Sequence, residues 1–197
     1  MNTLFFDTET TGLKKDKLDD IHPSQPLPVQ IGMKLDDANF NERAAFNYCL
    51  QPKNRWVVSP KAAEITGIDN AVADAYGCNF ITGIEMFLDM MDNADNIVAH
   101  NIGFDITVMR RAVAVYSSMT DQPYADPFAG KTVTCTMLNS VDEVKATPMR
   151  YGRYKWPKLE ECMQHFFNER LDGAHDALVD VRGCSRVYYK LKELGII

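Results

Sequence analysis

Apolar positions in the N-terminal part of the chain fall into short runs separated by polar turns. Bulky runs of this kind predict three strands, over Asn2–Asp7, Val29–Leu35 and Ala44–Leu50. The polar turn between the second and third runs is too short to hold a crossover helix. We therefore expect these two strands to pair antiparallel.

From residue 80 onward the apolar positions recur mainly at helical spacing. This spacing predicts helices around Phe80–Met91, Phe104–Val115, Leu159–Phe166 and Leu178–Leu191. Two short apolar runs between them, Ile97–Ala99 and Lys131–Cys135, predict a fourth and a fifth strand. A meander followed by alternating helices and strands predicts an α/β fold, with a five-stranded mixed sheet covered by helices on both faces.

Composition narrows the class of protein without identifying its chemistry. The chain has 197 residues, of which 46% are hydrophobic and 24% charged, so we expect a single domain over residues 1–197. No apolar run approaches the roughly 18 residues that a membrane helix needs, and no secretory signal is visible, so we expect a cytoplasmic protein without membrane contact. Five widely spaced cysteines predict reduced thiols rather than a disulfide framework or a zinc site.

The net charge of −6 argues against a passive nucleic-acid binder, which would usually be basic. It does not argue against an enzyme that reaches phosphate groups through metal ions. The glycine-rich motifs of dinucleotide-binding oxidoreductases and of P-loop enzymes are absent, so neither class is supported.

The first candidate chemistry lies where the first strand ends in DTET. Asp7 and Glu9 are two residues apart, so both side chains point to the same side of an extended chain. Like charges about 4 Å apart repel by on the order of 4 kcal/mol near a protein surface. A divalent cation would relieve that repulsion, and oxygen ligands favour Mg²⁺ or Mn²⁺. The alternative is a polar strand end whose acids cap a turn.

Two further acidic segments follow, AHNIGFD and AHDALVD. Asp105 would lie in the first turn of a helix, where the helix dipole favours an acid for structural reasons alone. His175 and Asp180 are five residues apart, roughly 140° around a helix, so they converge only if His175 precedes the helix on the loop at Gly173. A histidine placed there can act as a general base near neutral pH. An exposed histidine near a helix start is the alternative.

Taken together, these segments resemble the three motifs of the DnaQ-like, DEDDh-type 3′→5′ exonucleases, in the family's order. The matching positions are Asp7-Thr8-Glu9-Thr10-Thr11-Gly12, His100-Asn101 leading to Phe104-Asp105, and His175 with Asp180. They span nearly the whole chain. A sister group carries Tyr four residues before the last Asp. Here that position is Asp176, and His175 lies one residue earlier, as in the histidine type.

The resemblance implies a ribonuclease H-like fold and two Mg²⁺ ions, with Mn²⁺ as a substitute. It implies that four acids hold the ions and that His175 takes a proton from the attacking water, releasing nucleoside 5′-monophosphates from a 3′ end. The four acids are Asp7, Glu9, Asp105 and Asp180. The implied substrate contacts are Thr10, Thr11, Gly12, Leu13, Asn101 and Phe104, although a place for Phe104 in the hydrophobic core is an equal alternative.

One basic stretch lies outside these motifs. Five bases and no acids occur between Lys145 and Lys158, interleaved with three aromatic residues. This composition is typical of a surface that binds single-stranded nucleic acid. A strand-guiding loop would use Arg150, Arg153, Lys155 and Trp156. A solvated, partly packed loop is the alternative.

The sequence therefore predicts a metal-dependent 3′→5′ exonuclease whose partners are nucleic-acid 3′ ends, with single-stranded DNA favoured. The same chemistry on RNA, as in oligoribonuclease-like or RNase T-like relatives, is the nearest alternative. A non-catalytic module that binds nucleic acid or accompanies a polymerase is a further one. A polymerase or repair partner is not identified by the sequence.

Overall fold

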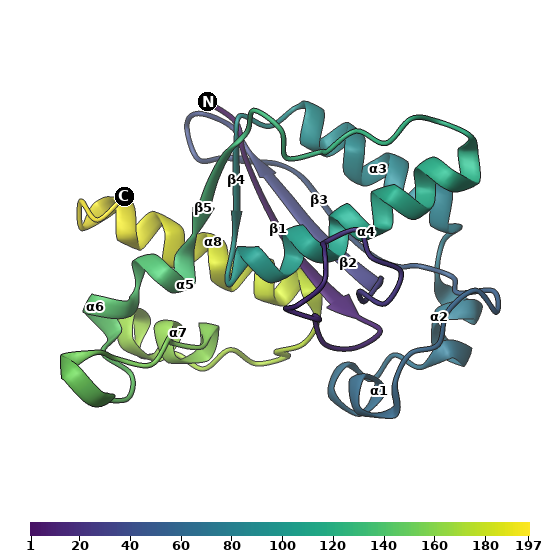
Figure 1. Cartoon of the computed structure of the whole chain (residues 1–197). Helices are drawn as coiled ribbons and strands as arrows, with labels where there is room; N and C mark the ends of the chain where they lie inside the picture. Colours follow the sequence, from purple (N-terminus) through teal and green to yellow (C-terminus); the bar gives the residue numbers. More distant parts are fainter.

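The five predicted strands form one mixed sheet in the computed structural model, which describes residues 1–197 (Figure 1). The strand order is β3-β2-β1-β4-β5. The strands are β1 (Thr3–Thr10), β2 (Pro28–Asp36), β3 (Glu42–Cys49), β4 (Asn96–Ala99) and β5 (Thr132–Cys135). β1, β2 and β3 pair antiparallel, whereas β4 runs parallel to β1 and to β5. The predicted antiparallel pair and the predicted mixed sheet are confirmed.

Alternate residues of β1 bury their side chains under different helices. Leu4 and Phe6 belong to the large core that α3 (Phe80–Asp92) and α4 (Ile102–Thr120) share with the sheet. Phe5 points to the opposite face, where it packs against Val181 and Tyr188 of α8 (Ala177–Glu193). Helix α7 (Leu159–Phe167) packs against α8. Helices therefore cover both faces of the sheet, and the period-two alternation of the strand decides which helix each side chain meets.

The structure adds several short helices that the apolar pattern did not predict. They are α1 (Pro60–Thr66), α2 (Asn70–Tyr76), α5 (Thr136–Asn139), α6 (Val141–Val144) and the 3₁₀ helix η1 (Arg150–Gly152). Helix α1 buries no residue and α2 buries only Ala73, so neither carries an apolar stripe. Ser59 and Asp69 begin them as N-caps by accepting hydrogen bonds from backbone N–H groups.

The position of α8 depends on a glycine in the neighbouring strand. Gly32 pairs with Asp7 across β1 and β2. A methyl group at Gly32 would lie 2.4 Å from the backbone carbon of Ala177, which is far inside contact distance. Only glycine therefore lets the start of α8 approach the sheet beside Asp7.

None of the helices combines the length and the apolar character that a membrane crossing requires. All five cysteines are unpaired, and Cys135, Cys162 and Cys184 are buried.

Candidate active site

Strand β1 contributes two acids to the candidate site. Asp7 and Glu9 project from the same face of the strand, because the residues lie two apart, and Thr8 between them points the other way. The strand continues beyond the predicted end at Asp7, since Thr8 and Glu9 still pair with β2. Both acids line a cleft of about 950 Å³ at the carboxyl end of β1.

Asp105 reaches the same cleft from the first turn of α4. It is buried, with 3% of its surface exposed, and its Oδ1 accepts two hydrogen bonds from Thr8. The backbone N–H of Thr8 lies 3.1 Å from this oxygen, and the Thr8 hydroxyl 2.7 Å. The helix dipole alone therefore does not explain the position of Asp105, because Thr8 of β1 also binds its carboxylate.

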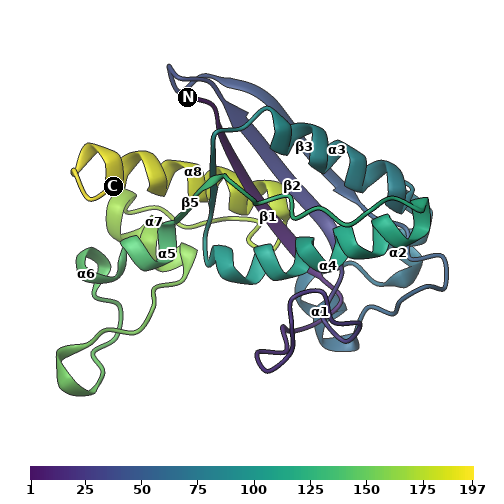
Figure 2. The same ribbon diagram turned by 45° about the horizontal axis from the view of Figure 1, so that its top comes forward.

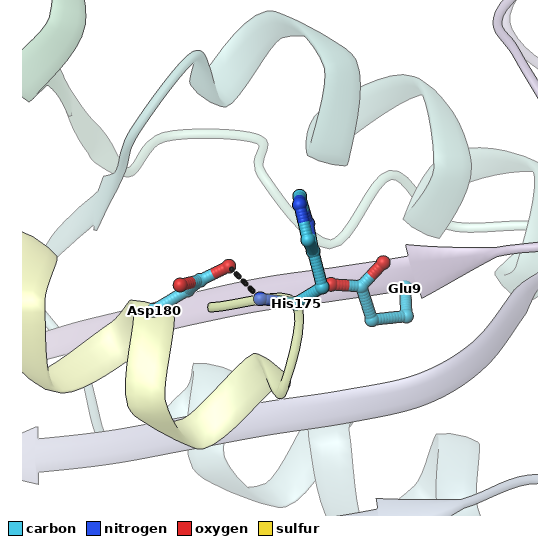
Figure 3. Close-up of side chains that lie close together, drawn as sticks. All are labelled: Glu9, His175 and Asp180. Atoms are coloured by element: carbon cyan, nitrogen blue, oxygen red, sulfur yellow. Dashed lines mark hydrogen bonds between the residues drawn. The ribbon is translucent and has the colours of Figure 1, made fainter. Parts of the chain in front are cut away.

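In the third acidic segment, AHDALVD, His175 lies before the helix that contains Asp180, as their convergence on one site requires. His175 precedes α8 on an exposed loop and has a left-handed backbone, with φ of 71°. Asp180 lies in the first turn of α8. The backbone N–H of His175 donates to Asp180 Oδ2 at 3.3 Å. Figure 3 shows Asp180 and Glu9 on either side of His175, whose ring projects away from this hydrogen bond.

Burial and mutual repulsion raise the pKa of every acid in the cleft. Desolvation is the largest cause for each, and it raises the pKa of Glu9 to about 7 and that of Asp180 to about 6. The pKa of Asp7 is also raised well above its usual value, by burial and then by the charges of Asp105 and Asp180. No lysine or arginine pairs with any of these carboxylates.

The donor set fits divalent cations. Ligand atoms of Glu9, His175 and Asp180 lie within 4.8 Å of one another. Asp180 Oδ1 is buried and has no hydrogen-bond partner, although an unpaired buried carboxylate oxygen is costly. Hard oxygen ligands with concentrated negative charge are what Mg²⁺ and Mn²⁺ require. The four residues that would hold such ions are Asp7, Glu9, Asp105 and Asp180.

The six residues expected to contact substrate all line the same cleft: Thr10, Thr11, Gly12, Leu13, Asn101 and Phe104. Leu13 is 81% exposed, which leaves its apolar side chain free for a ligand. Phe104 is partly exposed and belongs to none of the hydrophobic core clusters, so the alternative of a core position is wrong. Thr10 shapes the turn by donating from its hydroxyl to the Gly12 carbonyl at 2.7 Å.

The basic stretch lies outside the cleft. None of Arg150, Arg153, Lys155 and Trp156 lines it. One contact links the stretch to the wall of the cleft, because the Pro157 carbonyl lies 3.0 Å from Nε2 of His100.

Sequence reasoning missed two residues that position the acids. Thr8 orients Asp105, but a threonine inside a strand gives no signal of that role. Asp176 is the N-cap of α8 and also accepts hydrogen bonds from Asn47 and Gln30. The Asp before an apolar helical pattern is an N-cap signal that could have been read from the sequence.

Comparison with protein families gives a match over most of the chain. Residues 4–188 match the family described as RNase_T, Exonuclease. None of the curated proteins compared with the chain matches it.

Comparison with solved structures gives several similar folds. Exonuclease I of E. coli in complex with a dT13 oligonucleotide has a TM-score of 0.75 and 21% identity, and the match covers 97% of this chain and 41% of that one. The zinc-bound E. coli exonuclease I–ssDNA complex has a TM-score of 0.74 and 21% identity, covering 98% and 40%. A product-bound exonuclease I has a TM-score of 0.73 and 19% identity, covering 98% and 43%. The chain thus has the ribonuclease H-like fold of these exonucleases and spans about two fifths of their length.

Proposed function

The chain belongs to the RNase_T exonuclease family, and from that premise we propose that it is a metal-dependent 3′→5′ exonuclease acting on DNA. The observation that carries the proposal is the convergence of four carboxylates and His175 on one cleft. The cleft is also lined by Lys15 and Lys61, but no lysine or arginine lies within ion-pair distance of the four carboxylates. Such a set is costly for a protein that only binds nucleic acid, because it repels phosphate unless cations are present.

Two bound Mg²⁺ ions would neutralise the four carboxylates and stabilise the charge that develops on the attacking and leaving oxygens. Asp7 is buried beside the charges of Asp105, Asp180 and Glu9, so it would be one of the residues that hold the ions. His175, on its exposed loop, accepts the proton of the attacking water. The water oxygen forms a bond to phosphorus, the bond from phosphorus to the 3′-oxygen of the preceding nucleotide breaks, and that oxygen takes a proton from solvent. The product is a nucleoside 5′-monophosphate.

The rim of the cleft would hold the 3′-terminal nucleotide. Leu13 and Phe104 offer apolar surfaces for bases, and the backbone at Gly12 allows close approach. DNA is favoured over RNA because the similar solved structures include complexes with dT13, dA16 and single-stranded DNA. The motifs themselves do not separate the two sugars.

A pair of end-labelled substrates tests this proposal. Single-stranded DNA and RNA of one sequence, each labelled at the 5′ end, are incubated with the protein in Mg²⁺, in Mn²⁺ and in EDTA. We expect a ladder that shortens from the 3′ end, faster for DNA and absent in EDTA. Faster shortening of RNA would mean that RNA, and not DNA, is the preferred substrate. No shortening of either strand in Mg²⁺ or Mn²⁺ would overturn the proposal and favour a binding module.

A further inference from the structure

The basic stretch folds into a hairpin, which we define as residues 147–156 and call the arm. The N–H of Met149 donates to the Arg153 carbonyl at 2.7 Å, and the N–H of Lys155 donates to the Thr147 carbonyl at 2.8 Å. The tip is η1, where Tyr151 and Gly152 both have left-handed backbones. Figures 1 and 2 show the arm, in green below α6, projecting from the body of the molecule at the lower left.

Most residues of the arm are exposed, and its cationic side chains have no ion-pair partner. Tyr151 is 94% exposed and Trp156 is 61% exposed. No acid lies within ion-pair distance of Arg150, Arg153 or Lys155, although other arginines of the chain are paired. Unpaired cations beside exposed rings fit a ligand that offers both phosphates and bases.

The backbone at the tip adds a second observation. Tyr151 has a φ of 63°, a conformation that costs a bulky residue free energy and that glycine or asparagine adopts more readily. The tip therefore retains an aromatic ring at a position where a smaller residue would be more stable. This is expected if the ring has a contact to make.

His100 connects the arm to the cleft. Its Nδ1 lies 3.0 Å from the Thr136 hydroxyl, and its Nε2 lies 3.0 Å from the Pro157 carbonyl. A carbonyl can only accept, so Nε2 carries the proton and Nδ1 accepts from Thr136. Burial lowers the pKa of His100 to about 4, so the ring stays neutral in this arrangement. His100, which lines the cleft, thus bonds to Thr136 and to Pro157, the two ends of the segment that contains the arm.

We propose that the arm is a second binding surface for single-stranded nucleic acid, which holds the strand upstream of the nucleotides in the cleft. Its guanidinium and ammonium groups contact phosphates, and the rings of Tyr151 and Trp156 stack on bases. The statement that the 3′ end lies in the cleft rests on the proposed function, whereas binding by the arm does not. The consequence is that affinity depends on strand length.

The test compares a fluorescent 12-nucleotide DNA with a dinucleotide that is too short to span the cleft and the arm. The triple variant Arg150→Ala/Arg153→Ala/Lys155→Ala is compared with Lys53→Ala/Arg55→Ala/Lys192→Ala, which removes the same charge from exposed positions elsewhere. Binding of the 12-mer is measured by anisotropy in Ca²⁺ at several salt concentrations. Each variant is checked for an unchanged Tm.

We expect the arm variant to bind the 12-mer at least about tenfold more weakly, with a salt slope lower by about 2, because roughly 0.7 ions are released per phosphate contact on single strands. The control variant should bind like wild type, and hydrolysis of the dinucleotide should be unchanged in both. Tyr151→Asn suits the backbone at the tip, so it should keep the Tm while weakening 12-mer binding by roughly 5-fold or more.

If the arm variant and the wild type bind the 12-mer with the same affinity and the same salt slope, the proposal is overturned. The arm would then be a candidate surface for binding a protein partner. Binding that weakens while no substrate is hydrolysed would support the arm and contradict the exonuclease. If the substrate is hydrolysed but 12-mer binding does not depend on the arm, the result would support the exonuclease and contradict the arm. The two proposals therefore fail separately.

Discussion

Thr8 donates two hydrogen bonds to one oxygen of Asp105, across 97 positions of sequence. The pair joins β1 to α4 and leaves Oδ2 of Asp105 without a bond to Thr8. Two donors to a single oxygen fix the plane of the carboxylate. The cleft can therefore hold Asp105 in one orientation before any ligand arrives.

Replacing Thr8 with valine keeps the size of the side chain and removes its hydroxyl. We expect Thr8→Val to lower activity and Mg²⁺ affinity by about 10- to 100-fold, the usual effect of removing a group that orients a metal ligand. The measurement is the Mg²⁺ dependence of the hydrolysis rate. Thr120→Val is the control, since the Thr120 hydroxyl bonds only within α4. Equal Mg²⁺ dependence in both variants would contradict the role of Thr8.

The raised pKa values predict that stability without metal depends on pH. Glu9 has a pKa of about 7 and Asp180 of about 6, above the values in an unfolded chain, so the folded protein holds protons that the unfolded chain releases. These groups do not destabilise the fold below about pH 4. They lower the free energy of unfolding as the pH rises toward 7.

We therefore expect the Tm in EDTA to fall between pH 5 and about 7.5. Added Mg²⁺ should raise the Tm more at the higher pH, because protons no longer compete for the carboxylates. Glu9→Gln should flatten the fall in EDTA. A Tm in EDTA that rises over this range, with equal effects of Mg²⁺ at both ends, would contradict the assignment.

Asp176 should stabilise the start of α8 and the loop that carries His175. Its carboxylate accepts from the N–H groups of Leu178 and Val179, and N-caps of this type contribute about 0.5–2 kcal/mol. We expect Asp176→Ala to lower the free energy of unfolding by about 1–2 kcal/mol in urea titrations. Asp172→Ala, at an exposed position in the same loop, should change it by less than about 0.5 kcal/mol. Equal losses in the two variants would exclude the capping role.

Gly32 and Gly103 form a contrasting pair. Alanine at Gly32 would collide with the backbone of Ala177 and displace α8, whereas alanine at Gly103 meets nothing within 4 Å. We expect Gly32→Ala to lower the Tm and to reduce activity, since Asp180 moves with α8. Gly103→Ala lies in α4 and should stabilise the protein by up to about 1 kcal/mol. Thermal melts that rank the two variants in the opposite order would refute the close approach at Gly32.

The main elements were predictable where apolar residues recur with a clear period. Phe80–Met91 carries such a stripe in α3. Helix α1 does not, because it has no buried residue and contributes only the partly buried Ala62 and Ala63 to a small hydrophobic cluster. The convergence of Asp7, Asp105 and Asp180 was predicted through family resemblance, since their separations along the chain exceed any local pattern. Spacing alone predicted only that the side chains of Asp7 and Glu9 point to the same side of their strand. The contacts of Thr8 and His100 depend on which side chains the fold brings together, and no sequence pattern carries that information.

The central claim is that Asp7 serves metal-dependent hydrolysis, and Asp7→Asn tests it most directly. Asparagine keeps the shape of the side chain and removes its charge, so the fold should persist. With saturating Mg²⁺ and single-stranded DNA, we predict that release of nucleoside 5′-monophosphate falls by at least about 10³-fold, as expected when metal stabilisation worth several kcal/mol is lost. A folded Asp7→Asn protein that retains hydrolysis within tenfold of wild type would contradict the account.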